Sequence, residues 1–510
     1  MLEPETVVAA RRAPGEADRA ARDLERVGVL DVGSNSVRLV IFDGAARSPA
    51  YFYNEKILCG LGASLAETGR LDPEGCRRAL SAIRRFSFLA KSMGIEPLNC
   101  VATAAVRTAE DGAEFCEEVM RETGLRLDVA SGEREARLSA QGVLLGWPDA
   151  EGLVCDIGGS SMELAEILDG RIRNCITSDL GPLALKRAAG EMGLGKYIGR
   201  KLKELRSQVG RKFPVLFLVG GSWRVIARLD MERRNYPLKV LHEYKMDKRS
   251  VIDTVKWIRR ADLDKLRQDL SISPARMSLI PTASAVLKSL VRNFDPDQIA
   301  VSSYGIREGL LYDRMPDSLR RRDPLIEACR NMELSAARFP NFGDALYQFV
   351  LPLFASSGRE RLRLVKAACL LHDTTWRAHP DYRAEICFDN ATRANLGGLD
   401  HPGRVFLALA LFHRYKNSRA GAPHLKELAE ELLLPQWISE AEVLGKAMRF
   451  GSMFGVSRSL GRGRIAMRSQ ERRLVFHLPR ELSDLYGEVA QSRFHALAKA
   501  MDCAPIVEQC

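Results

Sequence analysis

An internal repeat constrains the fold of this chain more than any other feature. Asp31-Val-Gly-Ser-Asn-Ser-Val-Arg-Leu39 aligns without gaps on Asp156-Ile-Gly-Gly-Ser-Ser-Met-Glu-Leu164. Each copy follows a short apolar run and leads into a second run of alternating residues, the pattern of strand, tight turn and strand. Both copies then reach Asp-Gly, a hairpin-turn signal. Two matched copies predict two related domains facing each other across a cleft, because a solenoid needs more copies at a shorter period.

The rest of the chain divides by its hydrophobic pattern, and 510 residues are enough for several cores. β-branched runs alternate with helical stretches up to about Asp313, which is typical of an α/β fold. The predicted strands there are Val27–Leu30, Val37–Phe42, Leu153–Cys155, Met162–Ile167 and Val215–Val219. Beyond Met315 the β signal fades. The pattern predicts amphipathic helices from Leu325 to about Met448, then a strand at Arg472–Leu478 and a helix at Glu481–Met501. The predicted segments are a tail at 1–26, domains at 27–145 and 146–313, a helical domain at 314–448 and a small C-terminal domain at 449–510.

Composition excludes several classes of protein. No apolar run approaches the roughly 18 residues that a membrane-spanning helix needs. The N-terminus lacks the basic start and apolar centre of a signal peptide. Eleven cysteines, an odd number without a CxxC pair, indicate reduced thiols rather than a disulfide framework. We therefore expect a cytoplasmic protein that does not bind a membrane.

The net charge of +11 favours an anionic partner, which charge alone leaves open between nucleic acid, polyphosphate and nucleotide. Residues 314–510 hold 29 Lys and Arg against 22 Asp and Glu. Few aromatic residues interleave with the basic ones there, which disfavours single-stranded nucleic acid. The alternative is an ordinary solvated basic face. The densest basic stretch, opposed only by Glu471, consists of Arg458, Arg462, Arg464, Arg468, Arg472 and Arg473.

Each copy of the repeat carries residues suited to a metal–phosphate site. Asp31 and Asp156 end apolar strands, where a carboxylate is costly unless it meets a cation or hydrogen-bond donors. Glycines then allow close backbone approach, and successive N–H and hydroxyl groups can donate to an anion. Two ordinary hairpins are the alternative, but they do not explain the same residues at the same offsets twice. The candidate phosphate-binding residues are Gly33, Ser34, Asn35, Ser36, Gly158, Gly159, Ser160 and Ser161.

Five motifs in order resemble those of the exopolyphosphatase and guanosine pentaphosphate phosphatase family, a branch of the acetate and sugar kinase, heat-shock chaperone and actin superfamily. The first repeat matches DxGSNSxRL, and the second matches DIGGGSxEL with one change. The other three matches are ATxAxR at Ala102–Arg107, SGxxEA at Ser131–Ala136 and SxxGxREG at Ser302–Gly309. The resemblance implies two actin-like (ribonuclease H-like) α/β domains around a cleft, an α-helical HD-like domain and a small C-terminal α+β segment. It also implies a homodimer.

The resemblance assigns Glu135 as the catalytic residue. Hydrolysis needs a water that is activated or oriented toward the terminal phosphorus, and a carboxylate between the two loops can do this. Glu133 is the alternative if the alignment shifts by two residues. Both could instead lie on the exposed start of a helix, where acidic residues suit the helix dipole.

Other roles follow from the motifs. Asp31 and Asp156 are expected to hold Mg²⁺, and the resemblance adds Glu163 as a third ligand. Arg107 is expected to pair with phosphate oxygens, for which a planar guanidinium is suited; the alternative is a surface arginine. Gly220-Gly221-Ser222 resembles the superfamily's third loop, which is weak evidence for a nucleotide.

Two features depart from the family pattern. Ser160 stands where the family has a third glycine, which is expected to alter activity rather than abolish it. Leu371-His-Asp373 resembles the His-Asp pair of HD metal phosphohydrolases, and His413 resembles a later helix. No histidine lies between Asp313 and Leu371 to complete such a site. We therefore expect an HD-like helical fold without its metal, in which His372, His379 and His401 are helix-end or packing residues.

The sequence thus predicts an Mg²⁺-dependent, processive exopolyphosphatase that acts on inorganic polyphosphate. Guanosine pentaphosphate is an alternative substrate, because both substrates present a terminal phosphoanhydride. A phosphotransferase of the same superfamily, with ADP as acceptor, is a second alternative. A non-enzymatic binding protein is a third, which the intact Asp31, Glu135 and Asp156 disfavour.

Overall fold

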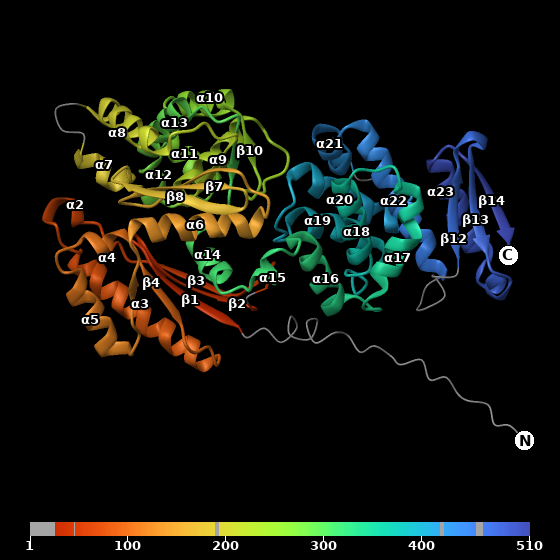
Figure 1. The fold of residues 1–510 in the computed structure, drawn as a ribbon, viewed down its shortest axis with the longest axis horizontal. Helices are drawn as coiled ribbons and strands as arrows, with labels where there is room; N and C mark the ends of the chain where they lie inside the picture. The colour runs from red at the N-terminus through yellow and green to blue at the C-terminus, as the bar shows by residue number, and fades with distance from the viewer. Residues whose placement is uncertain (1–25, 45, 189–192, 419–422, 455–462) are drawn as a thin grey trace, which may run out of the picture. The chain divides into compact units, whose positions relative to one another are not determined.

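The computed structural model describes residues 26–510 except 45, 189–192, 419–422 and 455–462, so most of the predicted tail lies outside the described residues. The chain divides into two compact units, Met1–Ala130 with Leu310–Leu319, and Ser131–Gly309 with Arg320–Cys510 (Figure 1). The first unit has one β-sheet and the second has two. The bounds predicted from the sequence for the five segments stay predictions.

The first unit is built on a five-stranded sheet in the order β3-β2-β1-β4-β5. The first three strands run antiparallel, and β4 and β5 continue the sheet parallel to β1. The strands are β1 (Val27–Val32), β2 (Ser36–Phe42), β3 (Tyr51–Leu58), β4 (Asn99–Ala102) and β5 (Asp128–Val129). The helices are α2 (Leu65–Thr68), α3 (Pro73–Ser92), α4 (Ala104–Thr108) and α5 (Gly112–Thr123).

Helix α3 shows why the first unit folds as it does. Asp72 caps it by accepting a hydrogen bond from Gly75 N at 2.7 Å, and Pro73 occupies its first turn, where no N–H is required. Its apolar residues recur at helical spacing, so one face, which includes Ile83 and Phe86, packs into the core with β1 and β2.

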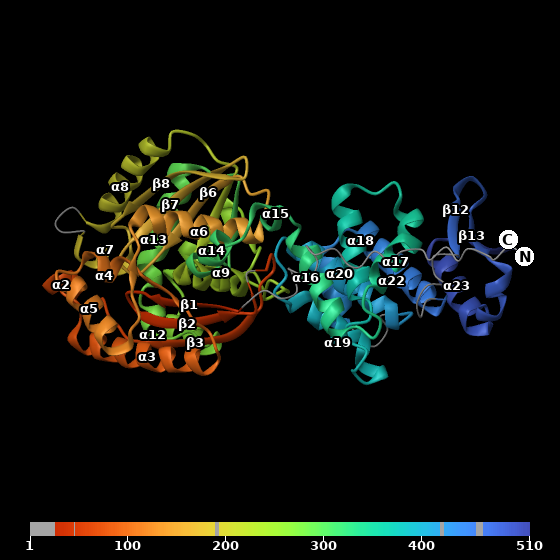
Figure 2. The same cartoon turned by 60° about the horizontal axis from the view of Figure 1, so that its bottom comes forward.

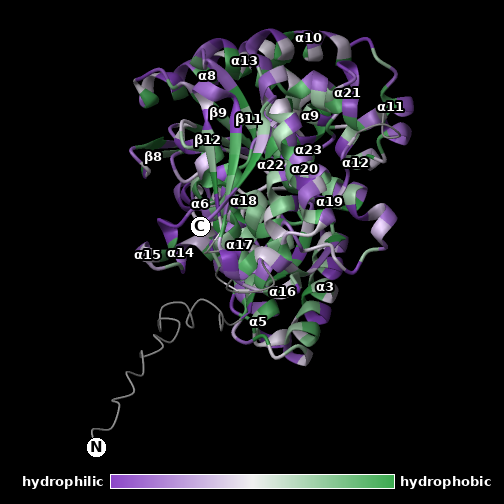
Figure 3. Ribbon diagram, turned by 90° about the vertical axis from the view of Figure 1, so that its right-hand side faces the viewer, coloured by the Kyte–Doolittle hydropathy of each residue, from purple (hydrophilic) through white to green (hydrophobic). Residues whose placement is uncertain are grey.

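The second unit contains a six-stranded sheet in the order β10-β11-β9-β6-β7-β8. Its strands are β6 (Gly152–Ile157), β7 (Met162–Leu168), β8 (Arg171–Ser178), β9 (Val215–Val219), β10 (Lys245–Met246) and β11 (Gln298–Val301). Strand β9 is apolar along its length and β11 is apolar after Gln298 (Figure 3), and both are buried after their first residue, as expected for parallel strands covered on both faces. Its helices are α6 (Gly132–Gly146), α7 (Pro182–Ala188), α8 (Leu194–Val209), α9 (Gly221–Arg233), α10 (Lys248–Ile258), α11 (Leu263–Asp269), α12 (Pro274–Met277), α13 (Ile280–Phe294) and α14 (Ile306–Asp313), the last ending in the first unit.

The two sheets repeat one topology. Strands β6, β7 and β8 form the same antiparallel meander as β1, β2 and β3, and β9 and β11 continue it in parallel as β4 and β5 do. Asp31 pairs in register with Arg38, and Asp156 pairs at the equivalent place with Glu163. The predicted α/β class and the internal repeat are therefore confirmed. Asp169-Gly170 forms the predicted tight hairpin with both φ angles positive, whereas Asp43-Gly44 begins a longer connection to β3.

Helices follow from residue 317 onward, whereas the hydrophobic pattern predicted them from Leu325. Helix α20 is the centre of this part and packs against α18, α19 and α22 (Figure 2). The helices are α15 (Asp317–Arg320), α16 (Pro324–Ala336), α17 (Phe342–Val350), α18 (Arg359–Leu371), α19 (Arg383–Arg393), α20 (His401–Tyr415), α21 (Pro423–Leu432) and α22 (Pro435–Phe454). An HD-like arrangement of these helices stays a prediction.

A three-stranded sheet and one helix end the chain. Strand β13 (Arg473–Leu478) confirms the predicted strand and lies between β12 (Arg464–Arg468) and β14 (Ala504–Gln509). Helix α23 (Glu488–Ala500) begins later than predicted, because a 3₁₀ segment at Arg480–Leu485 precedes it. Among the described residues, no helix combines the length and the apolar character needed to cross a bilayer.

Candidate functional site

The two glycine-containing loops share one backbone turn. Gly33 N donates to the Ser36 carbonyl at 3.0 Å in the first unit, and Gly158 N donates to the Ser161 carbonyl at 3.0 Å in the second. A Cβ added to either glycine would lie 3.5 Å from that same carbonyl oxygen. The repeat in sequence is therefore a repeat in geometry, and tight turns of small residues form anion-binding concavities.

The first loop is fixed by the segment that follows β3. The Ser34 carbonyl accepts a hydrogen bond from Gly62 N at 2.8 Å, and the Asn35 carbonyl accepts from Cys59 N at 3.0 Å and from Gly60 N at 3.1 Å. Ser34 itself is buried. Because its carbonyls are used in this way, the loop has a defined conformation before any ligand arrives.

Two further candidates lie in the first unit. Asp31 is half-buried near the carboxyl end of β1, directly before the first loop. Arg107 lies on the short helix α4, where its Nη1 donates to the Ala130 carbonyl at 2.6 Å. Arg107 is half-buried, and its role in binding phosphate stays a prediction.

Three acidic residues lie close together in the second unit. Glu163 on β7 is 2% exposed and Glu135 on α6 is 4% exposed, while Asp156 at the end of β6 is half-buried. Burial, followed by the charges of Glu135 and Asp156, raises the pKa of Glu163 well above its usual value. The hydroxyls of Ser161 and Thr177 act in the opposite direction. Such a cluster is costly without a cation or proton, which marks it as a candidate functional site.

Helix α6 brings Glu135 to this cluster. Ser131 caps the helix by accepting a hydrogen bond from Arg134 N at 3.2 Å, and Glu135 follows in the first turn. A Cβ on Gly132 would lie 2.5 Å from Thr177 Cβ, so glycine is required for α6 to approach β8 this closely. Glu133, the alternative to Glu135, is exposed on the same turn.

Hydroxyl groups that the sequence analysis did not single out hold the carboxylates. Ser139 is fully buried, and its Oγ donates a hydrogen bond to Asp156 Oδ2. Thr177 Oγ1 donates to Glu163 Oε1 at 3.2 Å. Ser139 lies four residues after Glu135, so helical spacing alone places the two on one face and would have identified it.

The third glycine loop packs directly on Asp156. Gly220 has φ +114°, and a Cβ there would lie 2.6 Å from the Ile157 carbonyl oxygen and 3.0 Å from Asp156 Oδ1. The third loop therefore packs closely against Asp156. A glycine is needed at position 220 because φ is positive there and because a side chain would have no space. Its role in binding a nucleoside stays a prediction.

Ser160 sits in the second loop without backbone strain. The φ angle of Ser160 is not positive, so the backbone at this position does not require a third glycine. Gly181 packs against this loop, because a Cβ there would lie 2.2 Å from the Ser160 carbonyl carbon. The effect of Ser160 on activity stays a prediction.

The acidic cluster offers the kind of donor atoms that magnesium prefers. Among the described residues, no three His, Cys, Asp or Glu side chains converge as a complete metal site. Glu135 and Asp156 are close enough to Glu163 for their charges to act on it. Mg²⁺ prefers oxygen ligands, keeps several waters and takes only one or two protein carboxylates plus substrate phosphates. The acidic, oxygen-only donors therefore fit magnesium bound together with its substrate.

The His-Asp pair of the helical part is used for packing and an ion pair. Asp373 is 3% exposed and is held by the guanidinium of Arg338, with Nη2–Oδ1 at 2.6 Å and Nε–Oδ2 at 2.9 Å. This pairing contributes to lowering the pKa of Asp373. His372 at the end of α18 and His401 at the start of α20 are buried, and His379 is exposed beside a 3₁₀ turn.

The basic C-terminal stretch is partly paired within its own sheet. Arg458 and Arg462 lie outside the described residues. Arg468 contacts Glu508 at 2.8 Å, Arg473 contacts Glu471 at 2.6 Å, and Arg472 pairs with Asp502. No described residue pairs with Arg464, which is therefore the described arginine of this stretch best placed to meet an outside anion.

Comparison with known proteins adds sequence relatives. A model of the Ppx/GppA phosphatase family matches residues 40–318, and a model described as the C-terminal part of exopolyphosphatase matches residues 325–503. Exopolyphosphatase 1 of Mycobacterium tuberculosis is 34% identical over 165 residues, covering 32% of this chain and 48% of that protein. The chain thus spans about half the length of these curated relatives.

Longer but weaker matches exist as well. Guanosine-5'-triphosphate,3'-diphosphate pyrophosphatase of Aeromonas salmonicida is 25% identical over 415 residues, covering 76% of this chain and 80% of that protein. The crystal structure of an exopolyphosphatase from Cytophaga hutchinsonii covers 56% of this chain and 97% of that chain, with 22% identity and a TM-score of 0.52, and shares the fold. Because the first family model spans more than half of its length, the chain belongs to the Ppx/GppA phosphatase family.

Proposed function

We propose that this protein is a phosphoanhydride hydrolase that removes the terminal phosphate of inorganic polyphosphate. The observation that carries the proposal is the position of Glu135. It is buried in the first turn of α6, beside Asp156, Glu163 and the second loop. Membership of the family and the names of the exopolyphosphatase relatives support the same reaction.

Glu135 would position and activate the attacking water. A carboxylate that accepts a proton from water contributes about 10²- to 10⁴-fold to a rate. Its burial keeps the carboxylate out of bulk solvent, and its charge acts on the neighbouring Glu163. Glu133, exposed on the same turn, lacks this environment.

Asp156 and Glu163 would hold Mg²⁺ in the second unit, and Asp31 carries the equivalent carboxylate in the first. When bound, the ion would neutralise charge on the phosphoryl oxygens. Ser139 and Thr177 would keep the two carboxylates oriented through the hydrogen bonds described above. In this role they are positioning residues.

The loops and Arg107 would bind the terminal phosphate. Each loop is assigned to phosphate on the strength of the sequence repeat and the common turn. N–H and hydroxyl donors of this kind stabilise the charge that develops on phosphoryl oxygens during hydrolysis. The guanidinium of Arg107, anchored on the Ala130 carbonyl, adds charge-assisted hydrogen bonds.

Processive shortening of a long chain is part of the proposal. A polyanion must be held while its end is removed, and the basic C-terminal stretch would hold it. Arg464 is the described arginine to test. Arg464→Gln should weaken binding of long chains more than turnover of short ones, while equal effects on both lengths would argue against processive holding.

Guanosine pentaphosphate is a second candidate substrate. The Aeromonas relative matches 76% of this chain, whereas the exopolyphosphatase relatives match 32%. The test is phosphate release with Mg²⁺ from long-chain polyphosphate and from guanosine pentaphosphate, with ADP added in a parallel reaction. Faster release from polyphosphate supports the first proposal, faster release from the nucleotide supports the second, and ATP formation would establish a phosphotransferase instead.

Two further expectations complete the proposal. All eleven cysteines are free thiols, which suits a reducing cytoplasm. We also propose a homodimer, and sedimentation equilibrium would test it by returning twice the chain mass of 56.7 kDa.

A further inference from the structure

A large cavity lies in the second unit, away from the carboxylate cluster. It has a volume of about 710 Å³, within the range of small-molecule sites. One side is formed where strands of the six-stranded sheet begin, at Glu151, Val215 and Gln298. The other side is formed by the first turn of α18 and the segment before α16.

This cavity cannot be part of the phosphate site of the same sheet. The second and third loops lie at the carboxyl ends of β6 and β9, whereas the cavity meets the amino ends of those strands. Helix α6 shows how far apart the carboxylate cluster and the cavity are. Glu135 lies in its first turn, and Trp147, which lines the cavity, directly follows its last residue. Twelve residues of helix correspond to about 18 Å.

Glu243 is the unusual group in the cavity wall. It is 4% exposed, and its Oε1 is buried without a hydrogen-bond partner among the described residues. Its backbone has φ +65°, a conformation that costs a non-glycine residue free energy and is common at ligand-binding sites. Burial, followed by the charge of Asp400, raises the pKa of Glu243 to about 7. An unsatisfied buried acceptor of this kind calls for a donor.

Trp147 supplies an aromatic wall beside Glu243. Its ring packs on Phe217 with centroids 5.3 Å apart and on His242 with centroids 4.6 Å apart. These contacts and a hydrogen bond between the Trp147 side chain and Glu243 hold the indole in place, while Trp147 stays half-exposed toward the cavity. A fixed aromatic surface next to a carboxylate suits a planar ring that bears N–H donors.

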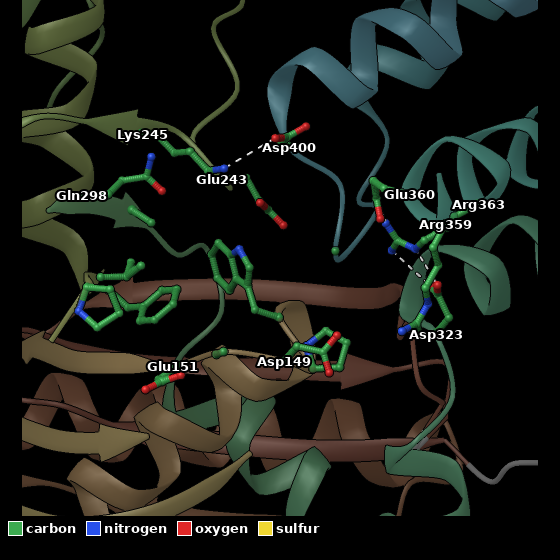
Figure 4. Close-up of a pocket in the computed structure, with 18 of the residues that line it drawn as sticks. Asp149, Glu151, Glu243, Lys245, Gln298, Asp323, Arg359, Glu360, Arg363 and Asp400 are labelled. Carbon is green, nitrogen blue, oxygen red and sulfur yellow. Dashed lines mark hydrogen bonds and ion pairs between the residues drawn. The ribbon is translucent and has the colours of Figure 1, made fainter. Parts of the chain in front are cut away.

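The opposite side of the cavity is suited to an anion. Figure 4 shows Glu243 and Lys245 on one side and Arg359 and Arg363 on the other. Arg363 is engaged by Asp323 and Glu360, but no described residue pairs with Arg359, which is exposed at the first position of α18. Gly358, the N-cap residue, gives this 13-residue helix no side-chain cap. Uncapped N–H groups and a free guanidinium together favour phosphate.

The charges divide accordingly. The sheet side of the cavity carries three acidic residues and one lysine. The helical side carries four arginines and three acidic residues, and one of these acidic residues, Asp400, pairs with Lys245. A ligand that matches this division offers donors at one end and negative charge at the other. We propose that the cavity binds a nucleoside phosphate, with its base against Trp147 and the unpartnered Oε1 of Glu243 and its phosphate at Arg359.

Calorimetric titration of the full chain tests this site, with GMP as the probe because guanine presents two adjacent N–H donors. Ribose 5-phosphate lacks the base and guanosine lacks the phosphate. We expect GMP to bind at least tenfold more tightly than either. Glu243→Gln should weaken GMP binding at least tenfold and leave ribose 5-phosphate unchanged. Arg359→Ala should weaken GMP and leave guanosine unchanged.

Three results would overturn the inference. They are an absence of GMP binding, equal affinity for GMP and ribose 5-phosphate, and GMP affinity that is lost in Glu135→Gln but kept in Glu243→Gln. The last result would place the nucleotide at the carboxylate cluster. Because the probe is not a phosphoanhydride, failure of this inference leaves the proposed hydrolase unaffected.

Discussion

Ser139 lies one helical turn after Glu135 on α6, and its hydroxyl donates a hydrogen bond to Asp156. One helix face therefore presents the proposed base and orients a proposed metal ligand. Ser139→Ala should lower kcat by about 10- to 100-fold, since a hydrogen bond to a charged group is worth about 1.5–3 kcal/mol. It should also raise the Mg²⁺ concentration needed for half-maximal rate, a change that a merely structural role would not produce.

Ser284→Ala is the matched control for this substitution. Ser284 is also a buried helical serine, but no described residue accepts a hydrogen bond from its hydroxyl. Its rate and magnesium dependence should match wild type. If both variants behave alike, Ser139 does not orient Asp156.

Gly220 should not tolerate a side chain. Gly220→Ala places a Cβ against Ile157 and Asp156 at a positive φ, so we expect a loss of about 1–3 kcal/mol of stability and a large fall in phosphate release. Gly221→Ala is the control, because a Cβ at Gly221 meets nothing within 4 Å. Thermal unfolding and phosphate release measure both effects, and equal outcomes for the two variants would contradict the packing described.

Glu243 should make stability depend on pH. Its pKa is about 7 when folded and 4.5 as a free group, so the folded state holds a proton that the unfolded state releases. This contribution is present below about pH 4.5 and is lost as pH rises through 7. Asp400, Lys245, Trp147 and Arg404 are the groups that act on it.

Glu243→Gln removes this titration. Relative to wild type it should be more stable at pH 8 than at pH 5, by an amount on the order of 3 kcal/mol. The midpoint temperature of unfolding across this pH range is the readout. A constant difference between variant and wild type at all pH values would show that Glu243 titrates normally.

Asp373 should matter for stability and not for hydrolysis. Asp373→Asn weakens the paired contact with Arg338, and we expect a loss of about 1–3 kcal/mol, because Arg338 is 43% exposed and partly screened. Phosphate release per folded molecule should stay at the wild-type level. Loss of a metal-dependent activity in this variant would instead reveal a working HD site.

The sequence was most informative where one local pattern carries both structure and chemistry. Strands β1, β2, β6, β7 and β9 and both loops followed from apolar runs that end in Asp and Gly. Strands β12 and β14 were not predicted, because short strands with charged or mixed residues at a sheet edge have no distinctive period.

Contacts that form only through tertiary packing could not be predicted from the sequence. Thr177 reaches Glu163 because β8 pairs with β7, and Glu243 meets Trp147 across nearly a hundred residues. Neither pair has a local signal. By contrast, the choice between Glu135 and Glu133 was left open by the motif, and burial separates the two side chains.

The most direct test of the proposed mechanism is phosphate release from long-chain polyphosphate by wild type, Glu135→Gln and Glu133→Gln. The two substitutions change the same residue type on one helical turn, one buried and one exposed. We predict that Glu135→Gln lowers kcat by about 10²- to 10⁴-fold with polyphosphate binding retained, and that Glu133→Gln resembles wild type. Undiminished release by Glu135→Gln, or loss in Glu133→Gln instead, would contradict the assignment of Glu135 as the residue that activates water.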